Sequence, residues 1–190
     1  MRESANIPAK WLKYLLYVGI ASMANYLLVS VLPNSLNRLF DYIFIAAALF
    51  LMFRLTPANG RYHKAILFTG VSLIISALNL KIVALAGSLC AILGQYQEYT
   101  AHGELLADRD PRLAGKWGSL FWFQFAVEVV SAAAITFVAM AMRSGGNAAD
   151  TPISSMITVA SAFVTVILKV VYLLYLKRSI KVLETEIVVE

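Results

Sequence analysis

The sequence predicts an all-α integral membrane protein with six transmembrane helices and with both termini on the cytoplasmic side. Hydrophobic residues make up 60% of the 190 residues and charged residues only 14%, whereas soluble proteins carry about 25% charged residues. The mean hydropathy is +0.74. Long apolar tracts recur along the chain, and lysine and arginine gather in alternate connections between them. Together these three features place most of the chain inside a bilayer.

Six apolar segments follow one another within a single polytopic domain, residues 1–190. A helix needs about 20 apolar residues to cross the hydrocarbon, and a proline inside it removes a backbone donor. All five prolines lie outside the segments, which we place at residues 11–32, 39–55, 62–80, 81–99, 118–142 and 153–176. Residues 177–190 are expected to form a short cytoplasmic tail.

The first segment is expected to remain in the protein rather than to be cleaved. Arg2, Lys10 and Lys13 precede an apolar run from Tyr14 to Leu32. This run is longer than the core of a signal peptide, and it lacks a convincing cleavage site of small residues. We therefore interpret it as the first transmembrane span.

The connection at Asn79-Leu80-Lys81 decides between five spans and six, because no proline marks it. Lysine and arginine accumulate in cytoplasmic loops. With six spans, twelve of the sixteen basic residues lie on the side of the termini, and Lys169 lies within a span. The other side then holds only Arg38, Lys81 and Arg143. With five spans the basic residues divide evenly, so the sequence favours six.

The longest cytoplasmic loop, residues 95–118, is expected to be helical and amphipathic. Asp110 followed by Pro111 is a favourable N-cap and first-turn pair, so a helix is expected to start there and run into the fifth span. Before it, the fourth span is expected to continue to about Leu106. The loop would then consist of two helical pieces joined by a kink at residues 108–110, with the second lying near the lipid headgroups.

Two roles remain open for this loop. Trp117 and Trp122 fit an aromatic belt at the membrane surface, and Arg112 and Lys116 can meet anionic lipid. The first role is therefore anchoring to the bilayer. The second is docking of a membrane-protein or cytoplasmic partner through these same four residues.

Two ionisable residues lie deep within the predicted spans. Glu128 lies twelve positions beyond Lys116, and Lys169 lies eight positions before Lys177. Such groups are costly inside a bilayer and usually find a partner within the bundle, so we predict a contact between Glu128 and Lys169. Helical spacing adds two polar stripes beside them, Gln124 with Ser131 on the fifth span and Thr158, Ser161, Thr165 and Tyr172 on the sixth.

This polar seam has two interpretations. It is either a site for a small solute or proton, with Gln124, Glu128, Thr165 and Lys169 as its residues, or a buried ion pair that fixes packing and register. The fourth span adds a different pattern, because its small residues recur at intervals of three or four and allow close helix approach. They are Ala84, Gly87, Ser88 and Ala91, and on another line Ala86, Cys90 and Gly94.

The sequence offers no recognisable catalytic chemistry. It contains no phosphate-binding glycine loop, no metalloprotease motif and no nucleophile elbow. Glu98 and His102 share a helix face, but a solvated charged face explains them as well as a metal site does, so we predict no metal, no cofactor and no enzymatic activity. Cys90 lies in an apolar run and is interpreted as a packing residue.

The function expected from the sequence is that of a non-enzymatic accessory or interaction subunit of a membrane complex. The alternative is a small-solute binding or transport protein that uses the polar seam between the fifth and sixth spans. The expected partners are the lipid bilayer and a protein bound at loop 95–118, with no nucleic acid. The expected location is a prokaryotic cytoplasmic membrane.

Overall fold

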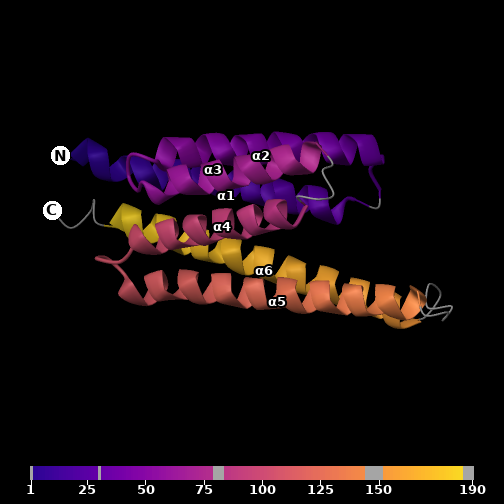
Figure 1. Cartoon of the computed structure of the whole chain (residues 1–190). Helices are drawn as coiled ribbons and strands as arrows, with labels where there is room; N and C mark the ends of the chain where they lie inside the picture. Colours follow the sequence, from indigo (N-terminus) through magenta and orange to yellow (C-terminus); the bar gives the residue numbers. More distant parts are fainter. Residues whose placement is uncertain (1, 30, 79–83, 144–151, 186–190) are drawn as a thin grey trace.

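The computed structural model describes residues 2–29, 31–78, 84–143 and 152–185, and within these ranges the chain is all-helical, with six helices and no strand (Figure 1). The helices are α1 (Arg2–Leu27), α2 (Asn34–Leu55), α3 (Arg61–Ala77), α4 (Ala84–Glu104), α5 (Pro111–Arg143) and α6 (Pro152–Thr185). Each corresponds to one predicted span. The connection at residues 79–81, on which the choice of six spans rests, lies outside the described residues.

Two of these helices, judged by length and composition, could cross a membrane. Within the described residues, these two are α2 and the part of α6 from Val159 to Thr185. The helical class predicted from the sequence is therefore confirmed within the described ranges.

The ends of α1 and α6 differ from the prediction. Helix α1 includes Pro8, so it begins well before the predicted span. Helix α6 continues to Thr185, and much of the predicted tail is therefore helical. Ile180 and Leu183 in this extension are buried. They lie three residues apart and so share one helix face, which can pack inside the bundle because α6 lies against α1.

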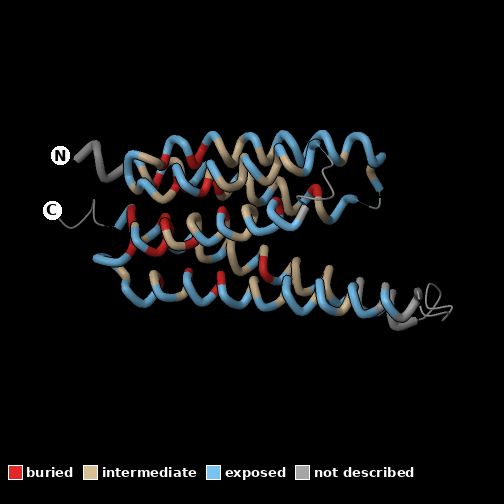
Figure 2. The backbone as a smooth tube through the Cα atoms, viewed as in Figure 1, coloured by how far each residue is buried: buried red, intermediate tan, exposed pale blue. Residues whose placement is uncertain are grey.

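The buried core lies at the end of the bundle where both termini lie (Figure 2). All six helices contribute, with Leu12 and Leu15 from α1, Leu55 from α2, Tyr62 and Ala65 from α3, Ala101 and His102 from α4, Trp117 and Phe121 from α5, and Leu176 and Ile180 from α6. Toward the opposite end, α5 and α6 run together away from the other helices (Figure 1). Fully buried side chains thus gather near the termini, whereas exposed apolar side chains occur at both ends of the bundle, from Ile7 and Phe53 at one end to Phe137 and Met140 at the other.

The small residues of α4 bring it close to α3. A Cβ atom at Gly94 would lie 2.5 Å from the hydroxyl oxygen of Thr69 and 3.4 Å from the carbonyl oxygen of Ala65. At Gly87 it would lie 2.9 Å from Cγ2 of Ile75. Two of the small residues singled out in the sequence therefore allow this close helix approach.

The loop at residues 95–118 forms the predicted pair of helix ends but not a separate surface helix. Helix α4 ends at Glu104, and the backbone N–H of Leu113 donates to Oδ1 of Asp110 at 2.8 Å, so Asp110 caps α5 as predicted. Helix α5 then runs without interruption to Arg143. The start of α5 is amphipathic as predicted, because Leu113, Trp117 and Leu120 are buried while Arg112 and Ser119 are exposed. Its position near the lipid headgroups stays a prediction.

Candidate functional site

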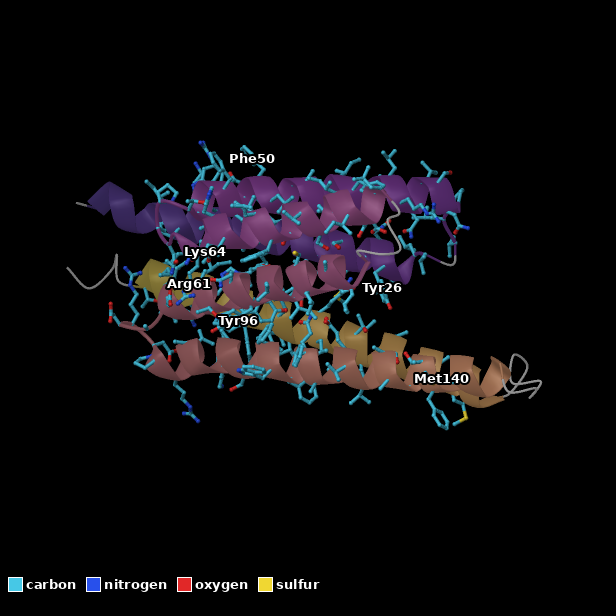
Figure 3. All side chains as sticks on the ribbon, in the orientation of Figure 1. Tyr26, Phe50, Arg61, Lys64, Tyr96 and Met140 are labelled. Atoms are coloured by element: carbon cyan, nitrogen blue, oxygen red, sulfur yellow. The ribbon has the colours of Figure 1, made fainter. Side chains whose placement is uncertain are left out.

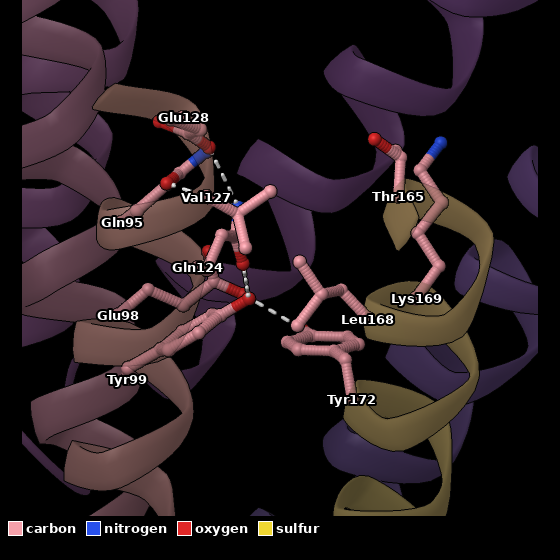
Figure 4. A pocket seen from close by; sticks show the side chains of 10 residues that line it. All are labelled: Gln95, Glu98, Tyr99, Gln124, Val127, Glu128, Thr165, Leu168, Lys169 and Tyr172. Atoms are coloured by element: carbon pink, nitrogen blue, oxygen red, sulfur yellow. Dashed lines mark hydrogen bonds between the residues drawn. The ribbon is translucent and has the colours of Figure 1, made fainter. Parts of the chain in front are cut away.

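A polar cavity of about 260 Å³ lies between α4, α5 and α6 (Figure 4). Its lining includes two apolar side chains, Val127 and Leu168, and otherwise consists of groups that form hydrogen bonds or carry charge. These are Gln95, Glu98 and Tyr99 from α4, Gln124 and Glu128 from α5, and Thr165, Lys169 and Tyr172 from α6. All four residues predicted for the polar seam therefore line one cavity.

Helical spacing explains why each helix contributes several residues. On α4, Gln95 and Glu98 lie three apart and Gln95 and Tyr99 lie four apart, so they share one face. The same spacing joins Gln124 with Glu128 on α5. The residues that α4 contributes were not predicted from the sequence, because residues 95–99 lie where the fourth predicted span meets the loop. The spacing of Gln95, Glu98 and Tyr99 was the signal that could have revealed it.

Gln124 forms hydrogen bonds with three other residues that line one side of the cavity. Its amide nitrogen donates to Oε1 of Gln95 at 3.2 Å and to Oε1 of Glu128 at 3.0 Å. Its amide oxygen accepts a hydrogen bond of 2.7 Å from the hydroxyl of Tyr99. Both ends of the amide are therefore occupied, which fixes its orientation and joins α4 to α5.

The predicted contact between Glu128 and Lys169 is wrong. No ion pair joins them within the described residues, and they stand on opposite sides of the cavity (Figure 4). The ammonium group of Lys169 lies 4.4 Å from the centre of the Tyr26 ring on α1. The negative charge of Asp41 on α2 acts on this ammonium group, and Asp41 also accepts a 2.9 Å hydrogen bond from Asn25.

The physical reason for this error is rotation about the helix axis. The predicted contact rested on the similar depth of Glu128 and Lys169 in the bilayer, and two residues at one depth can still point in different directions. Helix α6 packs against both α5 and α1, and Lys169 extends toward α1. Farther along the helices the predicted polar stripes do meet, since the hydroxyls of Ser131 and Ser161 lie 3.3 Å apart. The side chain of Thr158 lies outside the described residues.

Next to the cavity lies a buried cluster around His102. The hydroxyl of Tyr62 and Nδ1 of His102 are 2.8 Å apart, and the Trp117 ring centre lies 4.5 Å from that of the imidazole. Nε2 of His102 is buried, has no hydrogen-bond partner within the described residues, and faces Oε1 of Glu98 at 3.6 Å. A proton on Nε2 would point toward this carboxylate, so the geometry favours the tautomer in which Nδ1 accepts from Tyr62.

Glu98 connects this cluster to the cavity. Its Oε1 accepts a hydrogen bond of 2.7 Å from the Tyr172 hydroxyl, and both residues line the cavity. The Tyr172 ring also packs edge-on against Trp117, with ring centres 5.5 Å apart. In the part of the chain that the structure describes, no three His, Cys, Asp or Glu residues gather as a metal site would require.

The four residues predicted for docking separate into two groups. Trp117 is fully buried, and its indole N–H donates to the Ser179 hydroxyl at 3.2 Å. Arg112 is exposed, Lys116 is partly exposed and Trp122 is 62% exposed. Trp117 is therefore a core residue, and it can serve neither as a membrane belt nor as a docking residue.

A second group of polar residues joins the start of α3 to the last turns of α4 by hydrogen bonds. Glu104 accepts hydrogen bonds of 2.7 Å from Arg61 and 2.9 Å from Asn59, and Arg61 also donates to Gln97 at 3.1 Å. Partial burial would raise the pKa of Glu104, but these hydrogen bonds and the charges of Arg61 and Lys64 outweigh it and hold that pKa below its ordinary value.

Comparison with family models, with curated proteins and with solved structures finds no match to this chain. The chemistry available in the cavity follows from its own groups. Two carboxylates, two amides and two phenol hydroxyls can accept or donate hydrogen bonds to a small polar molecule.

Proposed function

We propose that the chain is a multi-pass membrane protein with six spans. The apolar windows in α2 and α6 support this, because only 11% of each is buried, whereas the core helix of a soluble protein is mostly buried. Large apolar side chains such as Phe50 on α2 and Met140 on α5 point away from the bundle (Figure 3). Soluble proteins rarely expose such extensive apolar surface.

The distribution of charge supports both termini on the cytoplasmic side. Arg61 and Lys64 lie at the same end of the bundle as the two termini (Figure 3), and twelve of the sixteen basic residues belong to that side by sequence. Labelling of single cysteines in a Cys90→Ala background, with a reagent that cannot cross the membrane, tests this. A cysteine at Lys81 should react from outside the cell and one at Lys177 should not. Reaction of both from the same side would refute the topology.

We further propose that the cavity between α4, α5 and α6 binds a small polar solute, as a binding or transport protein would require. The observation that carries this proposal is the concentration of eight polar side chains around one cavity in an otherwise apolar bundle. Polar groups in a membrane are costly and are usually functional. At about 260 Å³ the cavity is smaller than most drug-sized sites, which favours a solute of a few heavy atoms.

The charges around the cavity favour a solute that carries an ammonium group. Glu98 and Glu128 both line it, and the one basic residue of the lining, Lys169, extends toward Tyr26. The cavity therefore presents more negative than positive charge. The amide of Gln95 can orient the rest of the solute by hydrogen bonds, while Gln124 holds Gln95 and Glu128 in place.

A thermal-shift titration in mild detergent tests this function. The probes are methylammonium, ethanolamine, glycine, acetate and glycerol, since a ligand that binds the folded state raises the melting temperature. We expect the ammonium compounds to stabilise the protein, and Glu128→Gln to weaken their binding roughly tenfold, as loss of a charged partner does. Glu184→Gln is the matched control, because Glu184 is exposed and lies outside the cavity.

The two interpretations of the polar seam predict different results for this variant. Unchanged melting of Glu128→Gln without ligand, together with lost binding, supports a solute site. A large drop in melting temperature without any ligand effect in either protein would refute the site and leave the seam as a packing device.

The accessory-subunit function remains a second proposal, supported by the exposure of both Arg112 and Trp122 on α5. Gentle extraction followed by native mass spectrometry tests it. A stoichiometric protein partner that is lost in the Arg112→Ala, Trp122→Ala variant would support docking at this surface. Extraction of the protein alone would count against it.

A further inference from the structure

A groove with basic and aromatic walls lies between the first part of α1 and the last turn of α2. Its volume is about 540 Å³, and its lining includes Ile7, Lys10 and Trp11 from α1 and Phe53, Arg54 and Pro57 from the end of α2 and beyond. A second groove of about 480 Å³ continues from it, since it shares Ile7 and Lys10 and adds Lys13 and Tyr17.

Two cations of this groove share one aromatic ring. The guanidinium carbon of Arg54 lies 4.7 Å from the centre of the Trp11 ring, and the ammonium nitrogen of Lys10 lies 5.8 Å from the same centre. Arg54 also lies 5.8 Å from the Phe50 ring. The rings hold the guanidinium in place, and a stacked guanidinium keeps its N–H edge available for a planar or tetrahedral anion.

Among the described residues, no carboxylate lines the larger groove beside these positive charges. Neither Arg54 nor Lys10 forms an ion pair in the described part of the chain. The adjoining groove contains one carboxylate, Glu184, together with Lys13. Like charges held close together repel one another, so an anion between Arg54 and Lys10 would be attracted to both.

Apolar surface surrounds the same charges. Phe53 is 60% exposed and Ile7 and Tyr17 are each about half exposed, and they lie beside the basic residues in the two grooves. A free phosphate ion would leave this surface uncovered. A lipid would place its phosphate on the cations and its acyl chains along the apolar side chains, and basic pockets between helices at the cytoplasmic surface bind such headgroups.

We propose that this groove is a binding site for an anionic phospholipid, with Arg54 as the bidentate phosphate ligand and Lys10 as the second cation. The site depends on the membrane location proposed above, but it is independent of the solute cavity. Its position at the end of α1 and α2 that carries Arg2, Lys13 and Arg54 corresponds to the cytoplasmic headgroup region of the proposed topology.

Native mass spectrometry in a neutral detergent tests this site. The probes are phosphatidylglycerol, phosphatidylcholine and inorganic phosphate, added separately to the delipidated full chain. We expect one phosphatidylglycerol to bind with higher affinity than phosphatidylcholine. Replacement of both cations in Arg54→Gln, Lys10→Gln should weaken this binding roughly thirtyfold, and Arg54→Lys alone should cause a smaller loss.

The matched control is Lys177→Gln, Arg178→Gln, which removes two exposed cations from the same expected membrane side. It should leave phosphatidylglycerol binding unchanged. Equal binding of phosphatidylglycerol by the groove variant and the wild type would overturn the proposal. So would displacement of the lipid by millimolar inorganic phosphate, since the groove would then recognise a free anion. Both variants change exposed residues, and circular dichroism should verify that their helix content equals that of the wild type.

Discussion

The hydroxyl of Tyr172 donates a hydrogen bond of 2.7 Å to Oε1 of Glu98 and so joins α6 to α4. On one side of this bond lies the polar cavity, and on the other lies the buried imidazole of His102, whose Nε2 is 3.6 Å from the same carboxylate oxygen. The Tyr172–Glu98 pair therefore lines the cavity and also contacts the buried cluster around His102. A ligand that moves Glu98 would also change the surroundings of His102.

Tyr172→Phe should destabilise the protein, because it removes the hydroxyl donor from a largely buried carboxylate. A hydrogen bond to a charged group is worth about 1.5–3 kcal/mol, and thermal unfolding in detergent measures the loss. Tyr14→Phe is the matched control, since Tyr14 is exposed. Equal melting of the two variants would contradict the structural role assigned to the bond.

The two tryptophans of α5 should respond very differently to truncation. Trp117→Ala removes a fully buried ring and should cost about 3–5 kcal/mol of unfolding free energy. Trp122→Ala changes an exposed side chain and should stay within about 0.5 kcal/mol. Chemical unfolding followed by circular dichroism measures both. Similar losses for both would mean that α5 is rotated differently about its axis.

Two glycines should show opposite effects when replaced by alanine. At Gly94 the new Cβ would meet Thr69 and the Ala65 carbonyl of α3, and such overpacking costs about 1–3 kcal/mol. At Gly70 of α3, the new Cβ would have nothing within 4 Å. The higher helix propensity of alanine should therefore stabilise the protein by up to about 1 kcal/mol. Thermal unfolding of the two variants provides the comparison. A stabilising Gly94→Ala would refute the close contact of α3 and α4.

The hydrogen bonds of Glu104 with Arg61 and Asn59 predict that the stability of the protein depends on pH. Because the pKa of Glu104 in the folded protein lies below the ordinary value of 4.5, its contribution is present above pH 4.5 and disappears as the pH falls through the folded pKa. Glu104 is substantially exposed, so this contribution should be only about 0.2–1 kcal/mol. Glu104→Gln should therefore melt lower than the wild type at pH 7, and this difference in melting temperature should shrink as the pH falls below 4.5, whereas Glu184→Gln should follow the wild type at every pH.

The sequence by itself determined most of the local structure. The apolar tracts gave a helix for each of the six predicted segments, because hydrophobic runs and prolines act over a few residues. The cap of α5 at Asp110 was predictable for the same reason, since a side chain that bonds a backbone N–H three residues ahead needs no distant partner. The polarity of Gln124, Glu128, Thr165 and Lys169 also identified, in advance, four residues that line one cavity.

Only the tertiary structure decided how each helix is turned about its axis. That rotation buries Trp117, directs Lys169 toward Tyr26 instead of Glu128, and brings Glu98 of α4 into the cavity. Depth along a helix follows from counting residues at 1.5 Å each, but direction depends on which neighbours pack against it. In a chain whose helices are apolar on nearly every side, the hydrophobic pattern gives little information about that choice.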